Sequence, residues 1–338
     1  MSNGPDLTHF VQHRQLDIYE QGMARQGYAY GVDLRRSRWL ASSTVGNVLV
    51  RAVDRAWPQL ARHLLDEAMV PVAHGAQAVP TALLRELRQH TNLLRAPLPT
   101  VRLLRPEQRG RWPLVTAIGA THGGSLWLVL DVDALMTLDA DKRAFLLGAG
   151  LGHLHCEHAV FFSAHLLAER REGNSSIRAL QSILTPWTRV MMFSADRAGL
   201  LACGRLETAI SVIENPPVAI GDDPDPSWLP PTPKPAVRIQ ALEEFARSSV
   251  FARVQAMRAR QRELARAITG GVGLFSKSDA SSRQPGANSS APAEAQSEAQ
   301  SEAQSEAQSS GTEQIHVPAD AWSLARVDAR LTTRLNLL

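Results

Sequence analysis

The chain has 338 residues, of which 44% are hydrophobic and 20% charged, so it is long enough to bury a substantial core. Its formal net charge is only +3, and its arginines are interspersed with acidic residues, which argues against nucleic-acid binding. Two cysteines provide no disulfide framework, and neither a signal peptide nor an apolar run of membrane-spanning length is present. We therefore expect a cytoplasmic protein without a transmembrane segment.

Helices followed by a small sheet are predicted for the first part of the chain. The spacing of apolar residues is typical of amphipathic helices over 45–65 and 81–94. Short runs of apolar and β-branched residues predict strands at 100–104, around 114–117 and at 126–130. Because helical segments outnumber these strands, we expect an α+β fold that is predominantly α-helical.

Helical patterns resume after the last of these strands. The expected helices lie at about 140–167, 175–183, 187–203 and 236–268. Between the last two, a Pro-rich loop at 215–235 could be a lid, a partner-binding segment or, most simply, a surface connection. Glycine inside a helix costs about 1 kcal/mol relative to alanine, yet the first of these helices contains three. Gly148 and Gly152 would form a smooth face for close packing of another element, whereas Gly150 has no expected role.

The composition changes after Gly271 to Ser, Ala, Gln, Glu and Pro, with four E-A-Q-S repeats. Such a segment has too few apolar residues to form a core, so we expect a disordered linker. Beyond it we expect a short amphipathic helix whose apolar stripe packs on another surface, most simply the body of the same chain. The stripe consists of Leu324, Val327, Leu331, Leu335 and Leu338. The predicted divisions are a first domain at 1–268, a linker at 269–317 and a terminal helix at 318–338.

Four motifs follow one another with fixed spacing between 126 and 202. The apolar strand LWLVL at 126–130 is followed by DALMTLDAD at 133–141, LLGAGLGHL at 146–154 and MFSADRAGLLA at 192–202. Their order and spacing resemble the HtpX-type, CAAX-prenyl endopeptidase family of zinc metallopeptidases, in particular its soluble bacterial branch. The resemblance implies a zincin-like metallopeptidase fold with a small sheet beside the former zinc helix.

An active helix of this family carries H-E-x-x-H, and here most of that chemistry is lost. The resemblance places the first zinc-binding His at Ala149, the general-base Glu at Gly150 and a third ligand, a Glu, at Met192. His153 is the remnant second ligand, and Asp196 is the remnant residue that would support the ligands. A catalytic zinc needs three protein ligands and an open position, so we expect no catalytic residue and no metal cofactor. Without a metal, His153 and Asp196 should find hydrogen-bond partners inside the protein.

A non-catalytic function is the first hypothesis that these losses support. The protein would be a pseudoenzyme, a metallopeptidase-fold scaffold that binds a polypeptide or another protein. In the family, an extended substrate adds to a sheet edge beside the zinc helix, and the resemblance places this edge strand at 126–130. Its residues are Leu126, Trp127, Leu128, Val129 and Leu130. The sequence identifies neither the partner nor the oligomeric state.

The alternative hypothesis is a zinc metalloendopeptidase with a rebuilt metal site. On one continuous helix, His153 and Glu157 would share a face, and His155 and His158 would share another. Because these residues surround the helix, no more than two can converge on one point, and further ligands must come from elsewhere. The candidate ligands of such a site are His153, Glu157, His158 and His122.

Overall fold

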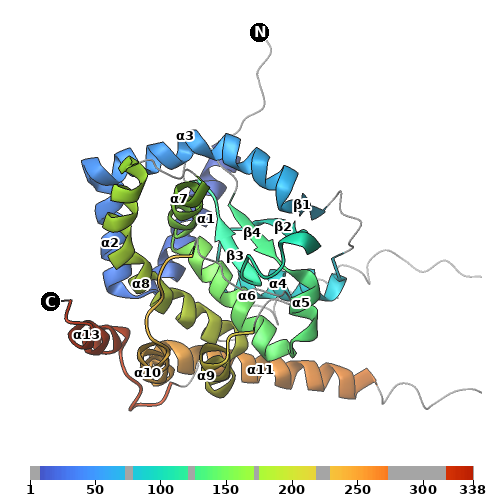
Figure 1. Cartoon of the computed structure of the whole chain (residues 1–338). Helices are drawn as coiled ribbons and strands as arrows, with labels where there is room; N and C mark the ends of the chain where they lie inside the picture. The colour runs from blue at the N-terminus through green and yellow to red at the C-terminus, as the bar shows by residue number, and fades with distance from the viewer. Residues whose placement is uncertain are drawn as a thin grey trace, which may run out of the picture. The chain divides into compact units, whose positions relative to one another are not determined.

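A computed structural model describes residues 8–72, 79–120, 126–170, 175–217, 229–272 and 317–337, and the structural statements below concern these residues. The chain divides into two compact units, one formed by Met1–Phe251 with Ala321–Leu338 and the other by Ala252–Asp320. The fold is mostly helical with one small sheet, consistent with the expected α+β class (Figure 1). In these ranges, no helix combines the length and apolarity that crossing a bilayer requires. The predicted E-A-Q-S linker lies largely outside the described residues.

Several predicted helices have different bounds in the structure. The helices are α1 (Thr8–Gln26), α2 (Gly31–Ser42), α3 (Thr44–Glu67), α4 (Thr81–Leu94), α5 (Val132–Thr137), α6 (Ala140–His155), α7 (Ala159–Arg170), α8 (Ser175–Cys203), α9 (Leu206–Glu214), α10 (Pro235–Ala246), α11 (Ser249–Val272) and α13 (Leu324–Arg334). The prediction of one continuous helix at 140–167 is wrong, because α6 and α7 are separate helices. The one predicted at 236–268 is likewise divided into α10 and α11, whereas the two predicted between 175 and 203 form the single helix α8.

Four strands form one mixed sheet. They are β1 (Met69–Pro71), β2 (Thr100–Leu104), β3 (Val115–Ile118) and β4 (Trp127–Leu130). Their order is β1-β2-β4-β3, with β4 parallel to β2 and antiparallel to β3. Trp127, for example, is opposite both Thr100 and Ile118. The predicted edge strand at 126–130 is therefore wrong, because both backbone edges of β4 are already paired and cannot accept a further strand.

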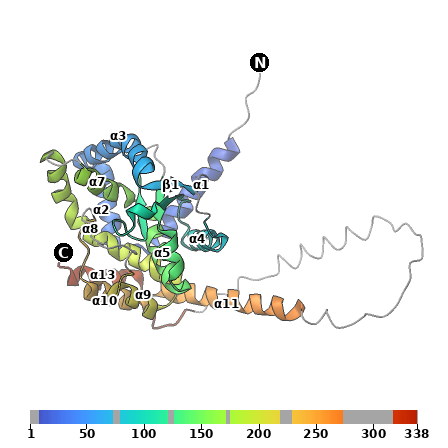
Figure 2. The ribbon, with the colours of Figure 1, turned by 45° about the vertical axis from the view of Figure 1, so that its right-hand side comes forward.

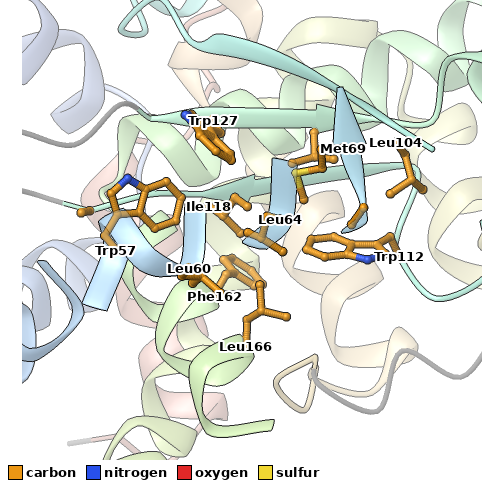
Figure 3. Packing of buried hydrophobic residues seen from close by; sticks show 13 residues of the cluster. Trp57, Leu60, Leu64, Met69, Leu104, Trp112, Ile118, Trp127, Phe162 and Leu166 are labelled. Carbon is orange, nitrogen blue, oxygen red and sulfur yellow. The ribbon is translucent and has the colours of Figure 1, made fainter. Parts of the chain in front are cut away.

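One face of the sheet packs on α3 and α7 (Figure 3). Side chains alternate along a strand, so Trp127 and Val129 point to this face and Leu128 points to the other. The rings of Trp127 and Trp57 meet edge to face with centroids 5.0 Å apart. The buried cluster combines these two tryptophans with residues of α3, β1, α7 and neighbouring segments, namely Leu60, Leu64, Ala68, Met69, Leu104, Trp112, Ile118, Ala120, Val129, Phe162 and Leu166.

On the opposite face, α6 lies between the sheet and α8 with little space on either side (Figure 1). A Cβ added at Gly150 would lie 2.4 Å from Cγ1 of Val115 in β3. A Cβ added at Gly148 or Gly152 would lie 2.3 Å or 2.6 Å, respectively, from an alanine Cβ of α8. The predicted close packing across Gly148 and Gly152 is confirmed. The expectation that Gly150 has no role is wrong, because this glycine lets the helix approach the sheet.

The C-terminal helix α13 packs on α2 and α10 of the first unit (Figure 2). Val327 and Leu331 are fully buried, and Leu331 joins a cluster with Tyr30 and Phe193. Burial of these two side chains confirms the prediction that the apolar stripe packs on the body of the chain. Leu338, the last residue of the predicted stripe, lies outside the described residues.

Polar contacts also hold the C-terminal segment on the rest of the first unit. Between α10 and α11, the backbone N–H of Trp322 donates to the carbonyl of Arg247, and that of Ser249 donates to the carbonyl of Trp322, both at 2.8 Å. Further along, Asp328 accepts a hydrogen bond from the backbone N–H of Gly31 and pairs with the buried Arg197 at 2.8 Å. The segment is therefore held by both apolar burial and charge pairing.

Candidate functional site

The turn between α6 and α7 brings several side chains of metal-ligand type close together. α6 ends at His155, and Glu157 adopts a left-handed backbone conformation with φ 64°. This conformation ends the helix, so that Cys156 and His158 are both buried while Glu157 is exposed. The assumption of one continuous helix, in which His153 shares a face with Glu157, is therefore wrong.

His153 and His158 meet across this turn, with their Nδ1 atoms 3.0 Å apart. Nε2 of His158 lies 3.0 Å from a carboxylate oxygen of Asp33 in the first turn of α2. The hydroxyl of Ser194 in α8 donates to the same carboxylate and accepts from the backbone N–H of Tyr30. All four side chains are buried.

The protonation of His153 follows from its surroundings. Burial, the neighbouring His158 and the guanidinium of Arg238 lower the pKa of His153 well below its usual 6.5, so the imidazole is neutral at pH 7. Nε2 of His158 donates to Asp33, and one of the two Nδ1 atoms donates to the other across the His153–His158 contact. The expectation that His153 has a hydrogen-bond partner inside the protein is confirmed.

Asp196, the other remnant residue, forms a bidentate ion pair with Arg238 of α10. The two contacts measure 2.7 Å and 2.9 Å, and the carboxylate is 2% exposed. Burial opposes the charge on Arg238, but the Asp196 carboxylate outweighs it and raises the pKa of the guanidinium. The expectation that Asp196 has a hydrogen-bond partner inside the protein is thus confirmed.

The three degenerate positions do not fit a catalytic zinc ion. Ala149 has no ligand atom, and the thioether of Met192 is a soft ligand suited to Cu(I). A glutamate at position 150 would collide with the sheet, because even a Cβ there lies 2.4 Å from Val115. His153 is therefore the single zinc-type donor of the family set, and one imidazole does not hold a catalytic ion.

Of the residues suggested for a rebuilt site, His153 and His158 lie together, whereas Glu157 is directed elsewhere. The Glu157 carboxylate is 57% exposed and binds Arg25 at 2.6 Å, away from His153 and His158. His155 is held elsewhere, because its Nε2 lies 2.8 Å from the carbonyl of Gln21 and its Nδ1 lies 3.0 Å from the Tyr28 hydroxyl. Burial lowers the pKa of His155 to about 4. His122 lies outside the described residues.

A cavity of about 450 Å³ opens beside the same turn, with α1 as one wall. Its apolar lining includes Ile18, Gly22, Pro97, Leu126, Leu154 and Val160. Arg25 and Glu157 contribute a polar part of the lining, and Arg25 also donates to the carbonyl of His155. Ile18 is 61% exposed, and Leu98, next to Pro97, is 81% exposed. Large apolar side chains are therefore accessible at and beside this cavity.

Three residues that complete the site were not predicted from the sequence. Asp33, Ser194 and Arg238 come from α2, α8 and α10, and each meets its partner across more than 40 positions of sequence. Asp33 lies in none of the motifs, and Ser194 lies within the 192–202 motif without a role assigned to it. Arg238 is one of many arginines in the segment 236–268. Comparisons of the chain with protein-family models, curated proteins and solved structures found no match.

Proposed function

We propose that this protein is a catalytically inactive, metallopeptidase-like scaffold that binds an extended polypeptide segment of a partner. Catalytic inactivity is supported by the internal partners of the two residues that the resemblance assigns to a former zinc site. His153 is bonded to His158, and Asp196 is paired with Arg238. Gly150 is packed against the sheet where a general base would have to stand. These contacts replace both the metal and the base with internal partners.

The cavity beside α1 supports the binding of a polypeptide. Its volume of about 450 Å³ suits one or two apolar side chains of an extended segment. Ile18 and Leu98 expose apolar surface to contact the rest of that segment. The Arg25–Glu157 ion pair provides a donor and an acceptor for its backbone. This mode of binding uses side chains and a cavity, whereas the interior position of β4 excludes strand addition there.

Fluorescently labelled, unfolded casein tests both parts of the proposal in one mixture. Anisotropy measures binding and gel electrophoresis measures cleavage, each with added zinc. We expect binding without cleavage. Ile18→Asp should weaken binding about tenfold or more, because burying an isoleucine side chain is worth about 1.5–3 kcal/mol. Leu264→Asp changes an equally apolar, 56% exposed side chain that does not line the cavity, and should leave binding unchanged.

Two outcomes would contradict the proposal. Cleavage of casein that is lost in His153→Ala would show that the chain is an active peptidase. Equal binding by the Ile18→Asp variant and the unmodified protein would remove the cavity from the proposal. The alternative function, a zinc metalloendopeptidase using His153, Glu157, His158 and His122, is not favoured, because Glu157 is directed to Arg25.

A further inference from the structure

Three buried side chains of metal-ligand type meet at the turn between α6 and α7. Asp33, Cys156 and His158 each offer one ligand atom, and these atoms lie within 4.8 Å of one another. The three residues are 3%, 1% and 0% exposed. Carboxylate oxygen, thiolate sulfur and imidazole nitrogen are the donor types that zinc binds in proteins. We propose that Asp33, Cys156 and His158 form a structural zinc site that fastens α2 to this turn.

Charge balance favours a divalent ion at this position. The buried carboxylate of Asp33 receives hydrogen bonds from the Ser194 hydroxyl and from His158. A zinc ion adds two positive charges, which the carboxylate and a Cys156 thiolate neutralise while the imidazole stays neutral. The assembled site would therefore carry no net charge. A neutral assembly costs far less to bury than an isolated ion.

The backbone of the turn directs the side chains of Cys156 and His158 to the same side. Cys156 and His158 flank Glu157, whose left-handed φ of 64° lets its two neighbours point inward together. A non-glycine residue in this conformation is strained by about 1–3 kcal/mol, and such strain is concentrated at functional sites. Zinc bonds of about 2.0–2.3 Å place ligand atoms about 3.5 Å apart. Nε2 of His158 is already 3.0 Å from Asp33, and all three ligand atoms lie within 4.8 Å, so small side-chain shifts would bring them to zinc distances. The hydroxyl of Ser194 or a water molecule can complete the tetrahedron.

The protons balance when zinc binds. The thiol of Cys156 gives up its proton to solvent as the Zn–S bond forms. His158 binds through Nε2, and its proton then sits on Nδ1, from which it donates to Nδ1 of His153. His153, with its own proton on Nε2, accepts at Nδ1 and orients the ligand imidazole as an outer-shell partner. One proton is therefore released for each zinc ion bound.

The site is structural and not catalytic, because it is closed to substrates. Neither the cavity of about 450 Å³ nor a second one of about 220 Å³ is lined by Asp33, Cys156 or His158. The proposal is independent of the polypeptide-binding function. A zinc ion held here would stabilise the fold without providing peptidase activity.

Titration of the full chain with Zn²⁺ and Co²⁺ tests this inference, after purification with a chelator that is then removed. We expect one equivalent of Zn²⁺, release of one proton per ion and an increase in melting temperature. Co²⁺ should give a thiolate charge-transfer band together with the visible bands of four-coordinate cobalt. Cys156→Ser should abolish the charge-transfer band. Cys203→Ser, which changes the other buried cysteine, should retain it.

The titration of the unmodified protein is decisive even if a variant fails to fold. Binding of less than about one-tenth of an equivalent of Zn²⁺ at a metal concentration of 100 μM would overturn the proposal. So would Co²⁺ binding without a thiolate band, or a band that Cys203→Ser removes and Cys156→Ser retains. Asp33→Asn should weaken Zn²⁺ binding at least tenfold, and an unchanged affinity would remove Asp33 from the site.

Discussion

Replacing Asp328 with asparagine would test how the C-terminal helix α13 is held on the body of the protein. The carboxylate of Asp328 lies 2.8 Å from Nη1 of Arg197, whose side chain is only 2% exposed. The rings of Tyr30 and Phe245 lie against the same guanidinium. Asparagine keeps the size of the side chain and can still accept from the N–H of Gly31. It removes the negative charge and leaves Arg197 without this carboxylate partner.

Removing one partner of a buried ion pair costs about 3–5 kcal/mol. Because Asp328 is 21% exposed and the two aromatic rings remain, we expect a loss of about 2–3 kcal/mol. For a protein of this size, that loss lowers the melting temperature by about 3–5 °C, measurable by circular dichroism. The control is Asp320→Asn, an exposed residue of the same segment, which should shift stability by less than about 0.5 kcal/mol. If Asp328→Asn had the same melting temperature as the unmodified protein, the Asp328–Arg197 ion pair would not be what holds α13 in place.

Three further outcomes can be measured by urea unfolding. Gly150→Ala should lower the free energy of unfolding by about 1–3 kcal/mol, because α6 is in contact with the sheet at this position. Gly22→Ala, in open space on α1, should leave the protein equally or more stable. Equal effects of the two substitutions would contradict the close packing of α6 on the sheet. The folded-state pKa of His155 is about 4, so the unfolded chain takes up the proton first and stability falls as the pH drops from about 6.5 towards 4. His155→Gln should flatten this decline, and an unchanged pH profile would exclude His155 as its source. Leu331→Ala should cost about 2–5 kcal/mol and the half-buried Leu335→Ala clearly less; the reverse order would mean that α13 packs differently.

Local patterns in the sequence were sufficient to predict much of the fold. The bounds of α4 and β2 match their predictions because apolar spacing and β-branched runs act within a few residues. The turn at Glu157 was missed because neither glycine nor proline marks it, and its left-handed backbone depends on tertiary contacts such as the Arg25 ion pair. Likewise, the sequence places 126–130 in a strand but says nothing about which strands lie on either side of it.

Less of the candidate site could be predicted. The resemblance marked Ala149, Gly150 and Met192 as positions without the chemistry of that family, and predicted that His153 and Asp196 find internal partners. The identity of those partners depends on how α2, α8 and α10 pack around α6, which no local pattern encodes. Whether the chain descends from the HtpX-type family stays a prediction.

Trp322 and Ser249 are adjacent through hydrogen bonds, although the whole of Ala252–Asp320 separates them along the chain. The intervening unit is therefore an insertion whose ends leave the first unit at neighbouring points. Because its two ends are neighbours, a change in the length of this insertion can leave Trp322 and Ser249 in place. The protein thus has a natural insertion point, where a reporter or an unrelated domain could be grafted without detaching α13 from α2 and α10.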